Sequence, residues 1–317
     1  MYPAFNLHTL SSQLDAIAAL TDGRIGAGRK FYVGNSTVLQ DKGISASDQN
    51  NGVEITTPFA TFERAMQAVT ANRLDNIVLL PGHAETITAD SDGSGFDMNT
   101  AGVNVIGTGW GTLMPTFTFT TATAADSQIA AANCSVMGVR FTCNIATQTA
   151  MMNISAADAF LCRNEFYLGT TTNDAALGIL TTAAANRLHV KKCKFLGVNR
   201  GTAGAVDCPQ AITIVGGDSI IIEECYMSGR FEAAVGAVEV ITTATTNLRL
   251  LSCHMENYTT ASEKCFYDTI TGSTGYTGGH YYYIDGTGNQ PETCATMQRG
   301  GGHYANAVNT LYAAFTA

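Results

Sequence analysis

The spacing of hydrophobic residues divides the 317-residue chain into regions of different texture. Near the N-terminus, Leu7, Leu10, Leu14, Ile17 and Leu20 recur at intervals of three and four residues, and a polar stretch follows them. This spacing places the five side chains on one face of a helix. The sequence therefore predicts a short amphipathic helix followed by a loop.

A second helix is predicted within residues 58–72, "PFATFERAMQAVTAN". Phe62, Met66 and Val69 fall on one side of such a helix, and Thr61 has the hydroxyl group expected of an N-cap. After Asp75 the helical period disappears. Up to about Gly288, short apolar runs alternate with clusters of Gly, Asn, Asp and Thr, which indicates strands separated by turns.

A loose repeat runs through this strand-rich region. Its units end at the anchor residues Phe141, Phe166, Phe195, Met227 and Met255, which are 25, 29, 32 and 28 positions apart. A second apolar run precedes most anchors, so each unit offers two or three short strands. Repeats of this length without a helix indicate a solenoid. Propeller blades need longer units, and the Asn-punctuated pattern of leucine-rich repeats is missing. We therefore predict an all-β fold, a right-handed parallel β-helix.

Three cysteines fit the same repeat. Cys193, Cys225 and Cys253 each precede an anchor by two residues. Because successive coils stack about 4.8 Å apart, like residues lie above like. We expect these small side chains to form an inert ladder in the core. Catalysis or metal binding is the alternative, and the absence of a Cys-x-x-Cys pair disfavours it.

Charge and composition narrow the function classes. The chain carries a formal net charge of -9, with 14% charged and 45% hydrophobic residues, a globular balance. This charge disfavours binding to nucleic acid and to anionic membranes. The N-terminus lacks the basic start of a signal peptide, Asp15 interrupts its apolar run, and no run is long enough to span a bilayer. We therefore expect synthesis in the cytoplasm and nine reduced cysteines.

Residues 28–87, "GRKFYVGNS…TTPFATFERAMQAVTANRLDNIVLLPGHAETI", resemble the entry segment of pectate-lyase-like β-helix proteins. They are most similar to virion-associated phage members: tailspikes, fibres and head-decoration proteins. The resemblance implies a structural virion protein with capsid or tail proteins as partners and a homotrimeric state, and the scarcity of acids along the coils favours a non-enzymatic role. The fold also hosts lyases and hydrolases. A polysaccharide depolymerase, or a non-catalytic adhesin for host surface glycans, is therefore the alternative.

The predicted organisation has three parts. Residues 1–50 form an N-terminal attachment segment, residues 51–290 the parallel β-helix, and residues 291–317 a C-terminal cap or interface. The last part is predicted to be an amphipathic helix, because apolar residues from Tyr304 to Phe315 follow helical spacing. Such a helix would cover the open strand edges of the last coil.

The acidic candidates for a site are weak. Glu223 and Glu224 form an adjacent pair within a predicted strand, where neighbours face opposite sides and cannot converge on one substrate. The loop Asp90–Asp97 half-matches a calcium loop, but Ala101 stands where the bidentate Glu belongs. We expect an ordinary turn there, with calcium binding as the alternative.

The remaining candidates are also interpreted structurally. Gly107–Gly111, "GTGWG", faintly resembles a dinucleotide loop, but a strand and not a helix is predicted to follow it. "GGHY" occurs at Gly278 and again at Gly301, within "GGGHYA", and similar turns are favoured over a two-histidine site for a metal or a carbohydrate. The Tyr281–Tyr283 cluster is the best guess for a sugar- or protein-contacting patch. His83 has no predictable acidic partner, so "DNIVLLPGHAE" is interpreted as the first coil. We assign no catalytic, cofactor-binding or metal residue.

Overall fold

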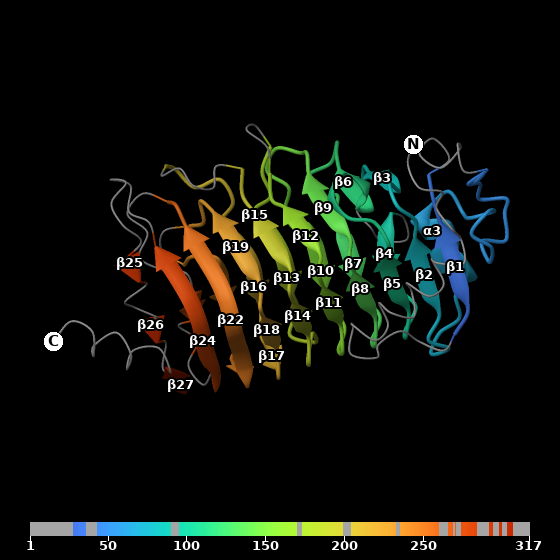
Figure 1. The fold of residues 1–317 in the computed structure, drawn as a ribbon. Helices are drawn as coiled ribbons and strands as arrows, with labels where there is room; N and C mark the ends of the chain where they lie inside the picture. The colour runs from blue at the N-terminus through green and yellow to red at the C-terminus, as the bar shows by residue number, and fades with distance from the viewer. Residues whose placement is uncertain are drawn as a thin grey trace.

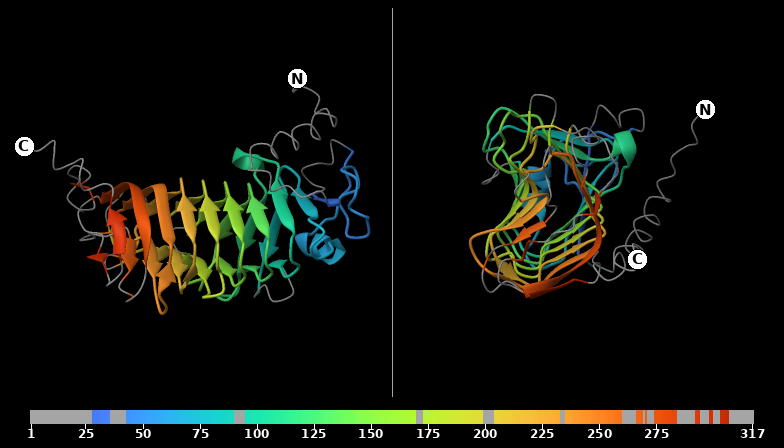
Figure 2. Two further views of the ribbon diagram at one scale, coloured as in Figure 1. Left: turned by 90° about the horizontal axis from the view of Figure 1, so that it is seen from below. Right: turned by 90° about the vertical axis from the view of Figure 1, so that its left-hand side faces the viewer.

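The chain folds into an elongated parallel β-solenoid (Figure 1). The computed structural model describes residues 28–35, 43–89, 95–169, 173–198, 204–232, 235–259, 266–268, 270, 274–283, 292–293, 298–299 and 303–306. The strands run side by side along the rod in chain order, and the end-on view shows coils of similar outline stacked on one another (Figure 2). The predicted all-β solenoid is confirmed.

Three ladders of parallel strands build the rod. The first ladder contains β1 (Lys30–Val33), β2 (Asn76–Leu79), β5 (Asn104–Gly107), β8 (Ser135–Met137), β11 (Phe160–Cys162), β14 (His189–Lys191), β18 (Ile221–Glu223), β22 (Leu248–Asn257) and β24 (Thr274–Tyr283). The second contains β3 (Ala84–Ile87), β6 (Thr116–Phe119), β9 (Arg140–Cys143), β12 (Glu165–Tyr167), β15 (Lys194–Leu196) and β19 (Tyr226–Gly229), followed by the later residues of β22 and β24.

The third ladder forms a separate sheet on another side of the rod. It contains β4 (Phe96–Met98), β7 (Ser127–Ile129), β10 (Met152–Ile154), β13 (Leu177–Thr181), β16 (Gln210–Ile214), β20 (Val238–Val240), β23 (Phe266–Asp268) and β26 (Gln298–Arg299). Smaller elements are η2 (Gly111–Leu113), β17 (Gly217–Asp218), β21 (Thr245–Thr246), β25 (Glu292–Thr293) and β27 (His303–Asn306).

The repeat anchors are aligned with one another along the second ladder. Phe141, Phe166, Phe195, Met227 and Met255 are successive Cα partners on neighbouring coils. Their side chains are fully buried, and the three phenylalanine rings stack at centroid distances of 5.3 and 4.7 Å. Stacked aromatic and aliphatic side chains on one inward row supply the hydrophobic burial that holds coil to coil.

A left-handed bend joins the first ladder to the second in five successive coils, from β8 to β22. Gly138, Arg163, Lys192, Glu224 and Ser252 occupy this bend with φ between 51° and 69°. The next position, called the bend row below, is buried and consists of Val139, Asn164, Cys193, Cys225 and Cys253. The predicted cysteine ladder is thus confirmed as a buried feature of these bends.

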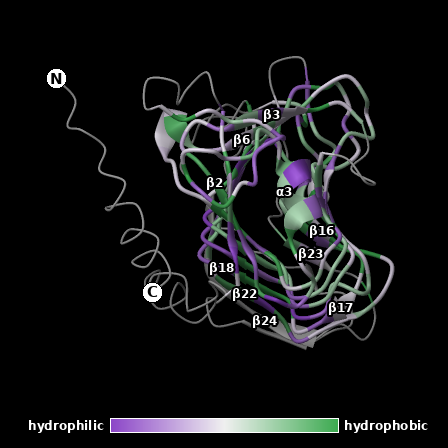
Figure 3. Ribbon diagram, turned by 90° about the vertical axis from the view of Figure 1, so that its right-hand side faces the viewer, coloured by the Kyte–Doolittle hydropathy of each residue, from purple (hydrophilic) through white to green (hydrophobic). Residues whose placement is uncertain are grey.

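Helix α3 (Phe62–Ala68) closes the N-terminal end of the core (Figure 3). Thr61 is its N-cap, as predicted, and accepts a hydrogen bond of 3.2 Å from the Arg64 amide. Phe62 is fully buried and stacks on Phe96 at 4.2 Å. The hydrophobic face of the helix therefore covers the first rungs of the solenoid and keeps them from water.

Asp75 fixes the start of β2 although it is completely buried. Its carboxylate accepts hydrogen bonds from the Arg29 and Thr70 amides and from the Arg73 guanidinium. Burial alone would raise the pKa of Asp75, but these hydrogen bonds outweigh it and lower the pKa. The charge is thus fully compensated where the chain enters the sheet.

Most residues at the two chain ends lie outside the described part of the structure. The predicted helix through Leu7–Leu20 lies outside the described residues. Tyr304, the first residue of the predicted C-terminal helix, instead lies in strand β27, and residues 307–317 are outside the described part. Among the helices that the described residues form, none has the length and hydrophobicity of a membrane-spanning segment.

Candidate functional site

The outer face of the second ladder carries a row of charged side chains. Arg140, Glu165 and Lys194 are Cα partners on successive coils, and they alternate with the buried phenylalanine row, so they point outward. Glu165 lies 2.8 Å from Arg140 Nη2 and 3.1 Å from Lys194 Nζ. Burial raises the pKa of Glu165, but the hydrogen bonds from Arg140 and Lys194 lower it further than burial raises it.

The next rungs of the same face gather polar groups around one carboxylate. Glu256 Oε1 lies 2.7 Å from His254 Nε2, while Oε2 accepts hydrogen bonds from the hydroxyl groups of Tyr226 at 2.8 Å and Tyr258 at 3.0 Å. The rings of Tyr226 and His254 stack at 5.1 Å. Despite partial burial, the hydrogen bonds lower the pKa of Glu256, and burial together with Glu256 raises that of Tyr258 to about 12.

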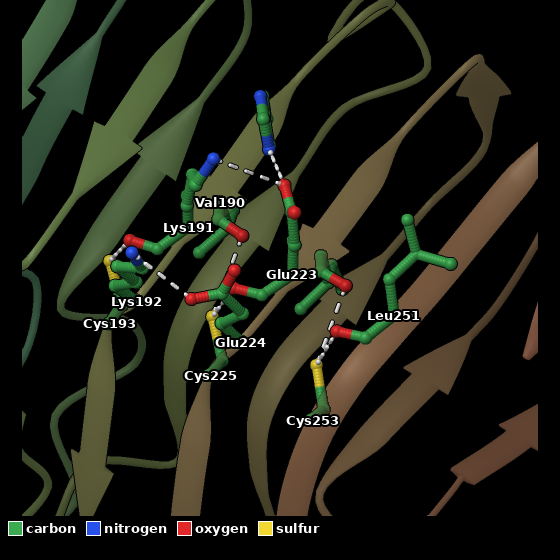
Figure 4. Close-up of polar contacts among 11 residues, drawn as sticks. Val190, Lys191, Lys192, Cys193, Glu223, Glu224, Cys225, Leu251 and Cys253 are labelled. Carbon is green, nitrogen blue, oxygen red and sulfur yellow. Dashed lines mark hydrogen bonds and ion pairs between the residues drawn. The ribbon is translucent and has the colours of Figure 1, made fainter. Parts of the chain in front are cut away.

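Glu223 and Glu224 both point outward, toward different cations (Figure 4). Glu223 Oε2 lies 3.0 Å from His189 Nε2 and 3.6 Å from Lys191 Nζ, and Glu224 Oε2 lies 3.1 Å from Lys192 Nζ. The expected placement on opposite strand faces is wrong. Strand β18 ends at Glu223, and Glu224 occupies the left-handed bend at φ 51°, so strand alternation stops between them.

The cysteines lie beneath these charges (Figure 4). Cys225 Sγ donates to the carbonyls of Val190 and Glu223 at 3.5 and 3.3 Å, and Cys253 Sγ donates to Ile222 at 3.4 Å. Burial raises the pKa of Cys225 well above its usual range, and contact with Cys225 together with burial raises that of Cys253. Since the thiolate is the reactive form, both thiols are held in the unreactive state.

His83 and Glu85, the pair in "DNIVLLPGHAE", lie beside each other after all. His83 is buried, and its Nε2 is 3.2 Å from Glu85 Oε1. The same Glu85 oxygen accepts the amide of Phe62, the first residue of α3. Glu85 is also the Cα partner of Phe117, whose neighbour on the next coil is Phe141. The pair therefore joins the base of the phenylalanine row to the start of α3.

Two glycine-rich candidates have defined surroundings. Residues Gly107–Gly111 end β5 and lead through η2 into strand β6, as predicted, and Trp110 is 86% exposed. Of the calcium-loop residues, 90–94 lie outside the described part. Asp97 is in β4, where its Oδ2 accepts from Asn99 Nδ2 at 3.0 Å. Among the described residues, no group of three or more His, Cys, Asp or Glu side chains could hold a metal ion.

The two "GGHY" segments differ from the expected turns. Gly278–Tyr283 lies within strand β24, which includes the predicted tyrosine patch, and His303 begins β27. The parallel register places His303 opposite Thr274, whereas His280 pairs with His254. The two histidines therefore do not share a rung.

A cavity of about 290 Å³ lies between α3 and β4. Glu63 and Gln67 line it from the helix, and Asp97 and Asn99 line it from the end of β4. These side chains are two carboxylates and two amides, and Met66, Val69, Gly95 and Thr100 complete the wall.

Comparisons with known proteins do not place the chain in a family. No family model matches the chain, and no curated protein matches it. A solved structure of a rhamnogalacturonan lyase is similar, with a TM-score of 0.49 and 14% identity over 80% of this chain. This chain spans 62% of that structure. A likeness at this level does not bear on activity.

Proposed function

We propose that this chain is a structural, non-enzymatic component of a bacteriophage particle, a head-decoration, spike or fibre protein that assembles as a homotrimer. The particle and the trimer come from the resemblance of residues 28–87. The rod-like solenoid suits a role in which a rigid body projects from, or bridges, other virion proteins of the capsid or tail.

The observation that carries the structural role is how three carboxylates on the outer faces of the first and second ladders are used. Glu165 and Glu223 are each held by cations of neighbouring strands, and Glu256 by His254 and two tyrosines. A general acid for glycoside cleavage needs a raised pKa. Those of Glu165 and Glu256 are lowered, which favours bracing between coils over proton donation.

Locating the protein in intact particles tests this proposal. Cryo-electron microscopy of the phage that encodes the chain should show three rods at each attachment site on the head or tail. Particles that lack the gene should lose that density. If the protein occurred on no particle and the purified rod released reducing sugars from bacterial envelopes, the structural proposal would be wrong.

A polysaccharide depolymerase is the competing enzymatic function, and two variants separate it from a scaffold. Glu165→Gln and Glu256→Gln keep side-chain size while removing the charge. In a depolymerase that uses either carboxylate, the matching variant would lose nearly all sugar release while the rod stayed folded. In a scaffold, wild type and both variants alike release no sugar.

Glycan binding without cleavage has one observation in its favour. Tyr226, His254, Glu256 and Tyr258 combine aromatic rings with a fixed carboxylate on the outer face, a combination that suits sugar recognition. Binding of full-length protein to host surface polysaccharide should then weaken at least about tenfold in Tyr226→Ala, a loss of some 1.4 kcal/mol. Thr142→Ala, on the same face several coils away, should bind normally.

A further inference from the structure

The first coils carry an apolar strip on the outside of the solenoid. It consists of Val78, Ile106, Met137, Phe160 and Cys162, called the covered strip below. These residues alternate along their strands with the core-facing row, so they point away from the core. Yet none is more than 4% exposed. Side chains that face outward from a sheet stay this dry where something packs over them.

Polar neighbours on the same face are equally shielded. Asn76, Asn104 and Ser135 also point outward, and their exposed fractions are 0%, 5% and 2%. They bond to each other across coils: Asn104 Nδ2 donates to Asn76 Oδ1, and Ser135 Oγ donates to Asn104 Oδ1 at 2.6 Å. Polar groups that satisfy one another in this way can lie under an apolar cover without penalty.

The described residues account for the edge of this cover. Tyr32, one rung before Val78, packs against the covered strip, and Ile44 packs with Leu80 beside it. Past Cys162 the same outward row continues as Lys191 and then Glu223, whose side chains are 20% and 26% exposed and form an ion pair. The cover therefore spans the strands from β1 to β11 and ends at β14.

We propose that residues 1–27 of the same chain pack along the covered strip as an amphipathic helix. Their apolar positions, Leu7, Leu10, Leu14, Ile17 and Leu20, form one face at helical spacing. From Leu7 to Leu20 such a helix extends about 20 Å. Four steps between strands, from β1 to β11, span about 19 Å. The predicted helix therefore matches the covered strip in length, and its apolar face matches the apolar side chains of the strip.

The attachment point of this segment lies at the first rung. The Gly28 amide donates to the Leu74 carbonyl at 3.1 Å, just before β2 begins. A Cβ at position 28 would lie 2.5 Å from the Leu74 carbonyl carbon and oxygen, so the close approach requires glycine. Gly28, the residue that follows the segment, therefore lies at the end of the strip that begins at Tyr32, and residues 1–27 need no further linker to reach it. The docking does not depend on the function proposed above.

Cys162 gives a reporter within the strip for the full-length protein. In the wild type, a thiol probe should label Cys162 slowly. Leu14→Asp puts a charge on the apolar face of the segment, so docking weakens and labelling of Cys162 should accelerate at least about tenfold. Ser12→Asp, on the opposite side of the helix, should leave the rate unchanged. Cys193, Cys225 and Cys253 should stay protected in all three proteins, which shows that the rod is folded.

A cross-link decides the occupant even if Leu14→Asp fails to fold. A photo-reactive amino acid at position 14 should couple to the peptide that contains Met137 or Cys162 and give a monomer-sized product. A dimer-sized product would assign the strip to a second copy. Rapid labelling of Cys162 in the purified wild type would show an open strip. Either result would overturn the proposal.

Discussion

The outer face of the first ladder has two halves with opposite chemistry. From β2 to β11 its outward residues are apolar or mutually hydrogen-bonded and shielded from water. From β14 to β18 they are His189, Lys191, Ile221 and Glu223, which are partly exposed, and Glu223 Oε2 lies 3.0 Å from His189 Nε2 and 3.6 Å from Lys191 Nζ. The inward row behind both halves is the same kind of buried aliphatic ladder, from Ile77 to Leu250.

This difference separates folding from interaction. The inward ladder repeats in every coil and is enough to stack them, because each rung buries an apolar side chain between two like neighbours. The outward row is free to vary, and it changes where the surroundings change. An apolar outward row marks a face that meets another protein segment, and a charged outward row marks a face that meets water.

The sharpest test exchanges one outward isoleucine in each half for aspartate. Ile106 is 1% exposed in the covered strip, so Ile106→Asp places an unpaired charge in a dry apolar contact. We expect it to lower the free energy of unfolding by about 4 kcal/mol or more. Urea unfolding, followed by circular dichroism, measures this change.

Ile221→Asp is the matched control in the charged half. Ile221 is half-buried, and its Cα partners on the neighbouring coils are His189 and Arg249, so a carboxylate there faces cations. The expected change is within about 1 kcal/mol. Equal losses from the two substitutions would mean that the two halves do not differ in cover.

The bend row gives a second, smaller contrast. In the first half, Asn164 is buried, accepts the Val139 amide at 3.0 Å and donates to the Val136 carbonyl at 2.9 Å. Asn164→Ala leaves that amide without its acceptor, and we expect a loss of about 2–3 kcal/mol. Cys225→Ala, at the same position of a later coil, removes one sulfur with weak hydrogen bonds and should cost about 1 kcal/mol.

The test is which of the two substitutions lowers the free energy of unfolding more. If Cys225→Ala cost more than Asn164→Ala in the same unfolding assay, the cysteines would be essential to the bends, and their packing and not backbone hydrogen bonding would set the bend geometry. Thermal unfolding of both variants at one pH gives an independent ranking.

The fold was predictable because it repeats. Phe141, Phe166 and Phe195 are each separated by one coil length, a spacing that stacked coils explain. The strand register confirms that the three residues are aligned. The bends were not predictable in the same way. Left-handed φ values at Arg163, Lys192 and Glu224 occur at residues that do not favour them, because stacking with the neighbouring coil imposes the conformation.

The candidate site could not be found from the sequence for a related reason. Its ion pairs join residues such as Arg140 and Glu165, or His189 and Glu223, which are a coil apart in the chain. Such contacts can be identified only when the strand register is known, because the register decides which outward residues are neighbours. The partner of His83 is only two residues away, but the sequence did not predict the contact. The contact forms because extended chain resumes directly after the Pro-Gly turn, with β3 beginning at Ala84, and alternation along it places His83 and Glu85 on the same side.

The smallest expected effect concerns pH and belongs to the charged face of the solenoid. The pKa of Glu165 is lowered by Arg140 and Lys194, which stay cationic at acidic and neutral pH. Its stabilising effect is therefore complete above the ordinary carboxyl pKa and is lost as the pH falls through the lowered pKa of the folded state. Its side chain is 16% exposed, so at pH 7 we expect Glu165→Gln to lower the free energy of unfolding by about 1 kcal/mol. In a urea series at decreasing pH, this difference from the wild type should shrink toward zero, while the exposed Glu54→Gln should match the wild type throughout. A Glu165→Gln deficit that did not change with pH would show that the side chain acts through packing and not through its charge.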